Sequence, residues 1–339
     1  MPTPGEIRQT VLAHAQGAMV LQLAFIGVAN GLFEALREGD AAAGDLAARL
    51  HLDAGYLTRW LEGAYAHGLL DATGGRFRLA ELGRAFLPGE PDTLMPVAVQ
   101  AMLGAHMSDR AALLMRTGER PGESVLSERE TILPWFGPML EAAFGPMFER
   151  EVLPAVPVLD EIGRRGGLVL DLGCGNGWYL RRLAVHHPGL RGVGLDGIEE
   201  NVRQASERAR RDGLAERLSF FVGDIYAHAP VEPADLVVMN RALHHVWDQR
   251  ERVFRLLRDA LRPGGAAVIW EPAWPDDMTR LREPRARALA VQNLSEHVQG
   301  NHLLRPAEIE AAFAEVGMPA GTVLVGGGFE AVVVGRRPA

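Results

Sequence analysis

Residues 169–177 read Val-Leu-Asp-Leu-Gly-Cys-Gly-Asn-Gly, an apolar run that leads through alternating glycines into a helical pattern. This order is typical of a buried strand followed by a tight turn and a helix. Glycines let the backbone turn sharply and pass close to a ligand, because no Cβ intervenes. A nucleotide-like ligand usually lies at such a turn, beyond the carboxyl ends of the strands.

The turn differs from that of a dinucleotide-binding protein. The dinucleotide fingerprint has a third small residue that packs the helix on the strand, whereas Trp178 stands in that position. Asp171 lies inside the strand end, where its carboxylate would repel a phosphate and attract an ammonium group. The turn therefore argues against a bound pyrophosphate and favours a ligand that carries an amino group.

Acidic residues also end the next two predicted strands. Asp196 lies 25 residues after Asp171, and a carboxylate at that place can accept two hydrogen bonds from ribose hydroxyls. Asp224 follows the third predicted strand, with Ile225 beside it. This pair is suited to bind an adenine amino group and to cover the adenine face.

Strand-like and helix-like segments alternate after a boundary near residues 150–166, where prolines and glycines gather. Such alternation predicts an α/β fold with a doubly wound, mostly parallel, seven-stranded sheet. The predicted strands are 168–172, 192–195, 218–222, 235–239, 266–271, 322–325 and 331–334, and the predicted helices are 177–186, 199–212, 249–261 and 305–316.

The first 90 residues have a different pattern. A helical segment over 5–38 is followed by helices near 41–50 and 54–67 and by a Gly-Gly hairpin over 70–79. This order indicates a winged helix. We therefore predict a helical winged-helix domain at 1–90, a methionine-rich helical linker or lid at 91–160, and the ligand-binding domain at 161–339.

These motifs together resemble the class I, Rossmann-like S-adenosylmethionine-dependent methyltransferases. The family's first motif matches 169–177, its second-strand acid matches Asp196, and its adenine-side acid matches Asp224. The segment 261–265, Leu-Arg-Pro-Gly-Gly, matches the turn before the family's fifth strand. The resemblance covers about residues 166–338 and implies S-adenosylmethionine as cofactor. It implies these cofactor-binding residues: Asp171, Gly173, Gly175, Asp196, Asp224, Ile225 and Asn240.

Two histidines, His244 and His245, follow the fourth predicted strand. Imidazole titrates near neutral pH, so these side chains are candidates for proton transfer. Leu243-His244 resembles the Leu-His pair of small-molecule O-methyltransferases, whose histidine is the general base. Glu271 resembles the acid that orients that histidine. On this resemblance we predict His244 as the base and His245 as the second candidate. Many methyltransferases with other acceptors also carry Leu-His-His here, so the pair does not by itself specify oxygen as the acceptor atom.

The residues expected around the methyl acceptor come later in the chain. The second acid of the plant-type enzymes falls on Leu303, which makes a complete His–Glu–Glu set doubtful. Polar residues that cluster nearby are expected to line the acceptor pocket: Glu296, His297, Asn301 and His302.

The composition excludes several kinds of chemistry. All 35 basic residues other than histidine are arginines, so no lysine can form a Schiff base or reach a phosphate from a P-loop. Metal-dependent catechol-type methyltransferases also use a lysine, and we predict no metal site. The single cysteine, Cys174, excludes an intramolecular disulfide. No signal peptide is recognised, and the apolar stretch 18–29 reads as too short to span a bilayer. We expect a cytoplasmic protein without a membrane partner.

The formal charge of −8 lies in the N-terminal half, since residues 1–160 hold 20 acids and 12 arginines while residues 161–339 hold 23 of each. A DNA-binding winged helix needs a basic face, so we expect no nucleic-acid partner. Related methyltransferases use such a domain to dimerise and to cover the acceptor. The apolar run 20–26 would be a liability on a monomer, and we predict a homodimer.

The sequence therefore predicts an S-adenosylmethionine-dependent methyltransferase that acts on a small, largely apolar molecule, most simply at oxygen. Three alternatives stay open at this point. They are methylation at carbon or nitrogen, a cofactor-binding protein of the same fold with non-methyl chemistry, and a winged-helix regulator without catalysis.

Overall fold

The structure is a computed structural model that describes residues 2–227 and 232–339. The chain divides into two compact units. One contains residues 1–109 and 129–143, and the other contains residues 110–128 and 144–339. Residues 91–143 therefore contribute to both units, and the predicted division at 90 and 160 stays a prediction.

The first unit follows the predicted order of helix, turn, helix and hairpin. Its three short strands form an antiparallel sheet in the order β1-β3-β2, and Asp53 caps α4 by accepting a hydrogen bond from the backbone N–H of Tyr56. The elements of this unit are α1 (Pro4–Ala29), α2 (Leu32–Arg37), β1 (Ala41–Ala42), α3 (Ala43–Leu50), α4 (Ala54–Ala66), β2 (Leu70–Thr73), β3 (Arg76–Leu79), α5 (Glu81–Arg84) and the greater part of α6 (Met95–Leu114) and α8 (Leu133–Met147).

Helix α1 is longer than the apolar stretch 18–29 indicated. Thr3 and Glu6 form a reciprocal capping box, so the helix begins at Pro4. Its length and composition make it the one helix among the described residues that is long and apolar enough to cross a membrane. The expectation that this region is too short for a span is therefore wrong, although one such helix near an N-terminus is weak support for a membrane protein.

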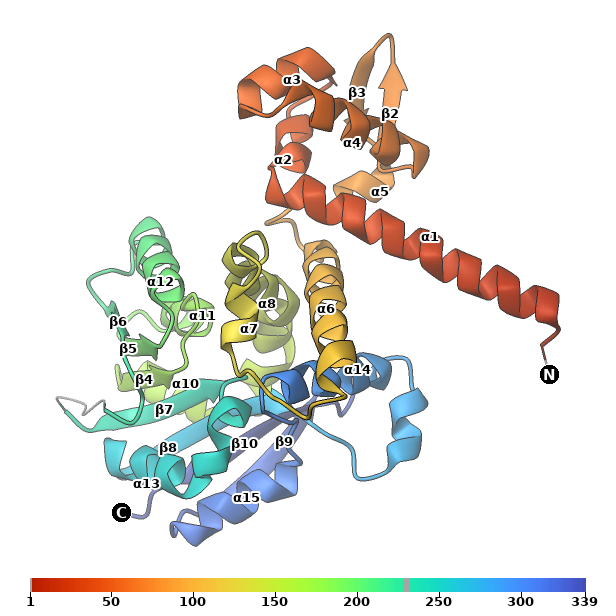
Figure 1. Ribbon diagram of the computed structural model, residues 1–339. Helices are drawn as coiled ribbons and strands as arrows, with labels where there is room; N and C mark the ends of the chain where they lie inside the picture. The colour runs from red at the N-terminus through yellow and green to blue at the C-terminus, as the bar shows by residue number, and fades with distance from the viewer. Residues whose placement is uncertain (1, 228–231) are drawn as a thin grey trace. The chain divides into compact units, whose positions relative to one another are not determined.

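The second unit confirms the predicted α/β fold. Its seven strands are ordered β6-β5-β4-β7-β8-β10-β9, with the first five parallel and β10 antiparallel to both of its neighbours (Figure 1). The strands are β4 (Leu168–Leu172), β5 (Arg191–Asp196), β6 (Leu218–Val222), β7 (Ala234–Asn240), β8 (Leu261–Pro272), β9 (Ala320–Val325) and β10 (Glu330–Arg336).

Helices cover both faces of this sheet, as a doubly wound fold requires. Side chains of α10, α11 and α12 share a buried cluster with Val169, and those of α13 and α15 share another with Leu170. The helical elements are α7 (Ser124–Ser127), η1 (Phe148–Val152), α9 (Leu153–Ala155), α10 (Pro157–Arg164), α11 (Trp178–His186), α12 (Glu199–Arg211), η2 (Leu243–Gln249), α13 (Arg250–Ala260), η3 (Met278–Arg282), α14 (Ala286–Val298) and α15 (Pro306–Glu315).

The strand register brings the predicted site residues to one edge of the sheet. Asp171 pairs with Val238 of β7 and with Gly194 of β5, so β4, β5 and β7 end close together. An added Cβ on Gly194 would lie 2.5 Å from the Phe220 ring, which shows how closely β6 packs there. The carboxyl ends of the parallel strands thus form a single row of polar residues.

Candidate active site

The glycine-rich turn after β4 needs its glycines for two different reasons. Gly173 and Gly175 have φ values of +76° and +54°, in the left-handed region. An added Cβ on Gly173 would lie 2.6 Å from the Cβ of Ala242, so the loop after β7 packs directly on the turn. Gly175 has open space around its Cα, which leaves its backbone accessible to a ligand.

Asp171 is a buried acid without a partner in the structure. The residue is 1% exposed, and neither carboxylate oxygen has a hydrogen-bond partner. Burial, together with the nearby charge of Asp196, raises the pKa of Asp171 to about 8. The buried Oδ1 of Asn240, at the end of β7, also lacks a partner. Orphaned buried polar atoms of this kind are costly, and an ammonium group is a suitable donor for either of them.

Asp196 is held rigidly at the end of β5. One carboxylate oxygen accepts a hydrogen bond from the backbone N–H of Gly175 at 2.8 Å, and the other accepts from Ile198 N and Asn201 Nδ2. Oδ1 therefore already has two donors, whereas Oδ2 has one and keeps a lone pair for a further donor. Asp224 is exposed and accepts from Tyr226 N, while Ile225 is half-buried. The predicted cofactor residues therefore occupy consecutive strand ends.

His244 lies at the start of η2 and is fully enclosed. Its Nδ1 is 2.7 Å from Oε2 of Glu271 at the end of β8, and the other oxygen of Glu271 accepts from Leu243 N at 2.7 Å. Burial alone would lower the pKa of His244, but the charge and hydrogen bond of Glu271, with those of Glu296, outweigh it and raise the pKa to about 10. The same contact lowers the pKa of Glu271.

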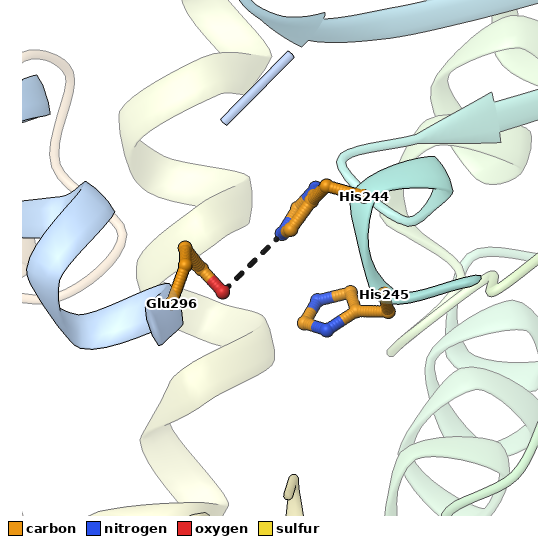
Figure 2. A group of neighbouring side chains, drawn as sticks. All are labelled: His244, His245 and Glu296. Atoms are coloured by element: carbon orange, nitrogen blue, oxygen red, sulfur yellow. Dashed lines mark ion pairs between the residues drawn. The ribbon is translucent and has the colours of Figure 1, made fainter. Parts of the chain in front are cut away.

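Glu296 on α14 is expected from the sequence only to line the acceptor pocket, but in the structure it contacts the proposed base. Its Oε2 lies 3.5 Å from Nε2 of His244 (Figure 2). Burial opposes ionisation, yet the hydrogen bond and charge of His244 lower the pKa of Glu296 to about 2. His244 is thus bracketed by two carboxylates. Leu303, on which the sequence alignment placed the second acid, is instead a buried apolar residue.

His245 stacks beside His244 with ring centroids 4.1 Å apart (Figure 2). Its Nδ1 lies 2.9 Å from Oε1 of Glu123 and 2.8 Å from Nδ2 of Asn301. Asn301 is therefore part of this polar group, whereas His297 and His302 are exposed and make no contact with it among the interactions described.

The histidine cluster has ligand atoms at a spacing compatible with a metal ion. The relevant atoms of His244, His245 and Glu296 lie within 4.8 Å of one another. In the described part of the chain, the ion pairs with Glu271, Glu296 and Glu123 already account for these positions. The absence of a resident metal stays a prediction.

Fold and site together define a class I methyltransferase: the sheet order, the glycine turn, the acids at β4 and β5, and a histidine beyond β7. Residues 169–265 match the methyltransferase domain family. The chain is 29% identical over 265 residues to the O-methyltransferase SfmM3 of Streptomyces lavendulae, covering 74% of each chain. It is 29% identical over 268 residues to the 3-hydroxy-5-methyl-1-naphthoate 3-O-methyltransferase of Streptomyces sahachiroi, covering 78% of this chain and 76% of that one.

Solved structures show the same fold over the whole chain. An O-methyltransferase family protein from Burkholderia thailandensis aligns with a TM-score of 0.72 at 19% identity, covering 100% of this chain and 99% of that one. Human N-acetylserotonin methyltransferase in complex with SAM aligns with a TM-score of 0.70 at 21% identity and full coverage of both chains. The chain is an S-adenosylmethionine-dependent methyltransferase, and the predicted class and cofactor are confirmed.

The residues at the strand ends fit this cofactor. The unpartnered carboxylate of Asp171 and the Oδ1 of Asn240 suit its ammonium group, the backbone at Gly175 is open, and Oδ2 of Asp196 has a lone pair for a ribose hydroxyl. The third small position of a dinucleotide turn is filled by Trp178, which packs against Phe148 and Trp270.

We predict that cofactor binding releases a proton from Asp171. At pH 7 a group with a pKa near 8 is mostly protonated, and an arriving ammonium lowers that pKa, so affinity should rise with pH until about pH 8. Calorimetric titration with S-adenosylhomocysteine in buffers of different ionisation enthalpy measures this proton. We expect nearly one proton released at pH 7 by the wild type and none by Asp171→Asn. Zero release by the wild type would show that Asp171 is already ionised.

Proposed function

We propose that this protein transfers a methyl group from S-adenosylmethionine to a hydroxyl oxygen of a small, largely apolar molecule, with His244 as general base. The observation that carries the proposal is the buried His244–Glu271 pair, 2.7 Å between Nδ1 and Oε2, on the loop that packs against the cofactor turn. The curated relatives, several of them O-methyltransferases, support oxygen as the target.

The bound cofactor supplies a methyl group that is already activated on a sulfonium, so the chain's own residues mainly align the acceptor and remove its proton. Asp171 and Asp196 fix the cofactor at the ends of β4 and β5. Glu271 accepts the Nδ1–H of His244, which leaves Nε2 directed away from it. The hydroxyl proton passes to Nε2 as the oxygen takes up the methyl group.

Glu296 determines when that base is available. In this structure Nε2 of His244 faces the Glu296 carboxylate, and the raised pKa keeps the imidazole protonated at neutral pH. An acceptor hydroxyl that enters between the two side chains would separate them. The pKa of His244 would then fall, and the imidazolium would lose its Nε2 proton to solvent before it takes the proton of the acceptor. We propose that the acceptor itself frees the base.

The test is methyl transfer from labelled S-adenosylmethionine to a panel of phenols, hydroxynaphthoates and hydroxyquinones, each paired with the corresponding aromatic amine. We expect label on oxygen. Nitrogen is the second candidate, because the N,N-dimethyltransferase OxyT of Streptomyces rimosus is 28% identical over 250 residues. Label found only on the amines would overturn the oxygen assignment. A calorimetric titration with S-adenosylmethionine that shows no binding heat would instead favour a winged-helix regulator without catalysis.

We further propose that the protein is a cytoplasmic homodimer and that α1 is its interface. Residues Ile7, Val11, Leu12, Met19 and Ile26 fall on one stripe of the helix, and each is at least 42% exposed. A stripe of this length is a liability unless another surface covers it. The charge of this half disfavours nucleic acid as the partner, and Arg59 of α4 is already paired with Glu62 at 2.5 Å.

Placing aspartates in the stripe should separate the subunits. For Val11→Asp combined with Met19→Asp, we expect the mass measured by light scattering to fall from a dimer to a monomer, because charge in an apolar interface is not compensated. The matched control is Ala13→Asp, an exposed position on the side of α1 away from the stripe. A double variant that stays dimeric, or a monomeric wild type that sediments with lipid vesicles, would contradict this assignment.

A further inference from the structure

Arg241 has an unusual backbone conformation next to the proposed base. Its φ is +53°, one of three such values for non-glycine residues in the described chain. The left-handed region is disfavoured for a residue with a long side chain, and it persists only where surrounding contacts enforce it. Contacts around the loop between β7 and η2 must therefore hold Arg241 in this conformation.

Three sets of contacts hold it. The backbone N–H of Arg241 donates to the carbonyl of Trp270 at 2.7 Å. Its guanidinium donates to Oε2 of Glu330 at 2.7 Å and lies 4.0 Å from the centre of the Phe144 ring. The Arg241 side chain is 7% exposed and that of Glu330 is 9% exposed, so the ion pair is largely dry.

Glu330 lies on β10, the strand that pairs with the end of β8, where Glu271 is located. It begins β10 and pairs with Pro272 of β8, while its neighbour Ala331 pairs with Glu271. The same oxygen of Glu330 also accepts from Nε1 of Trp270 at 2.9 Å. Burial raises the pKa of Glu330 in spite of Arg241, so the carboxylate depends on that guanidinium to stay ionised.

Arg241 lies in the chain between residues of the cofactor site and the proposed base. Asn240, with its unpartnered Oδ1, precedes it, and Ala242, which packs on Gly173, follows it. Two residues further on is His244. The positive charge of Arg241 is also one of the influences that keep the pKa of Glu271 low. A shift of this loop would move His244 relative to the cofactor turn.

We propose that Arg241 and Glu330 are a positioning pair that holds the β7–η2 loop so that His244 meets the acceptor in line with the cofactor. The inference rests on the proposed role of His244. Neither residue touches the reacting atoms; the pair acts through the loop backbone and through the strand that carries Glu271.

The test compares Arg241→Lys, Arg241→Gly, Glu330→Gln and the Arg241→Lys/Glu330→Gln double variant. Glycine adopts a φ of +53° freely, so Arg241→Gly removes the side chain without opposing the loop conformation. The matched control is Arg336→Lys. Arg336 lies on β10, the strand that begins with Glu330, and forms an exposed ion pair with Glu161. The measurements are kcat and KM for a hydroxyl acceptor, affinity for S-adenosylhomocysteine, thermal unfolding, and the downfield proton resonance of the His244 Nδ1–H.

We expect each single variant to lower kcat about tenfold to a hundredfold, the cost of a small misplacement at a reacting centre. S-adenosylhomocysteine affinity should stay within about twofold, and the double variant should lose no more than the worse single one. The downfield resonance, assigned by its loss in Glu271→Gln, should shift or broaden in the Arg241 and Glu330 variants but not in the control.

Wild-type kcat in Arg241→Gly, or an unchanged downfield resonance in all the variants, would overturn the positioning role. A fall in kcat that merely follows a fall in unfolding temperature would also overturn it. The resonance is measured on the free protein. It therefore reports on the pair even if His244→Gln proves active and the proposed base is wrong.

Discussion

Replacing His244 with glutamine should lower kcat for a hydroxyl acceptor by about 10²–10⁴-fold, the usual contribution of a general base. Glutamine is uncharged and its amide N–H can still donate a hydrogen bond to Glu271, but it cannot take up a proton. The donor is already activated, so a residual rate from alignment alone should remain.

Steady-state transfer of labelled methyl groups measures this loss, with S-adenosylhomocysteine affinity as the check that the cofactor site is intact. The matched control is His297→Gln, an exposed histidine on the same helix as Glu296, and it should leave kcat unchanged. A His244→Gln rate within about threefold of the wild type would exclude the general-base role.

The pH dependence of the same reaction tests the protonation state of His244. The base of the free enzyme must lose its proton, and its pKa is raised to about 10, so kcat/KM should rise with pH through the neutral range. Glu296→Gln removes one of the charges that stabilise the protonated imidazole. The rising limb should then move to lower pH, whereas a limb that stays in place would show that Glu296 does not control the proton on His244.

Replacing Asp196 with asparagine should weaken binding of S-adenosylhomocysteine by about 10²-fold. A hydrogen bond to a charged group contributes roughly 1.5–3 kcal/mol, and the ribose would lose the charge of its acceptor. Asparagine has the shape of aspartate but only one acceptor oxygen, so it can keep only one of the backbone hydrogen bonds that the two oxygens of Asp196 accept from Gly175 and Ile198.

Calorimetric titration measures this affinity, and circular dichroism checks the fold. Asp224→Asn is the comparison, because Asp224 is exposed and we expect it to lose no more than about tenfold, as for one partly solvated bond. An Asp196→Asn affinity within about threefold of the wild type would place the ribose elsewhere.

The cofactor half of the site could be predicted from sequence because its residues are local to strand ends. A strand, a glycine turn and a helix place Asp171 in a way that depends on few distant contacts. The spacing to Asp196 then follows from one helix and one strand. These residues could be predicted to lie together because neighbouring parallel strands bring their carboxyl ends to one edge of the sheet.

The acceptor half depends on packing that periodicity does not encode. Glu296 reaches His244 only because α14 packs with one particular face toward η2, and a residue seven positions away, Leu303, is buried in an apolar cluster instead. The ion pair of Arg241 with Glu330 joins the loop after β7 to the start of β10, 89 residues later in the chain. The clustering of Glu296 with the polar residues His297, Asn301 and His302 was the sole signal for it in the sequence.

The central claim is that one edge of the sheet holds the cofactor on Asp171 and Asp196 and presents the acceptor oxygen to His244. A crystal structure with S-adenosylhomocysteine and the best hydroxyl acceptor tests it most directly. The account predicts ribose hydroxyls on Asp196, the ammonium on Asp171, and the acceptor oxygen within hydrogen-bond distance of His244 Nε2, with Glu296 displaced. An acceptor oxygen that faces the sulfur but lies away from His244 would contradict it.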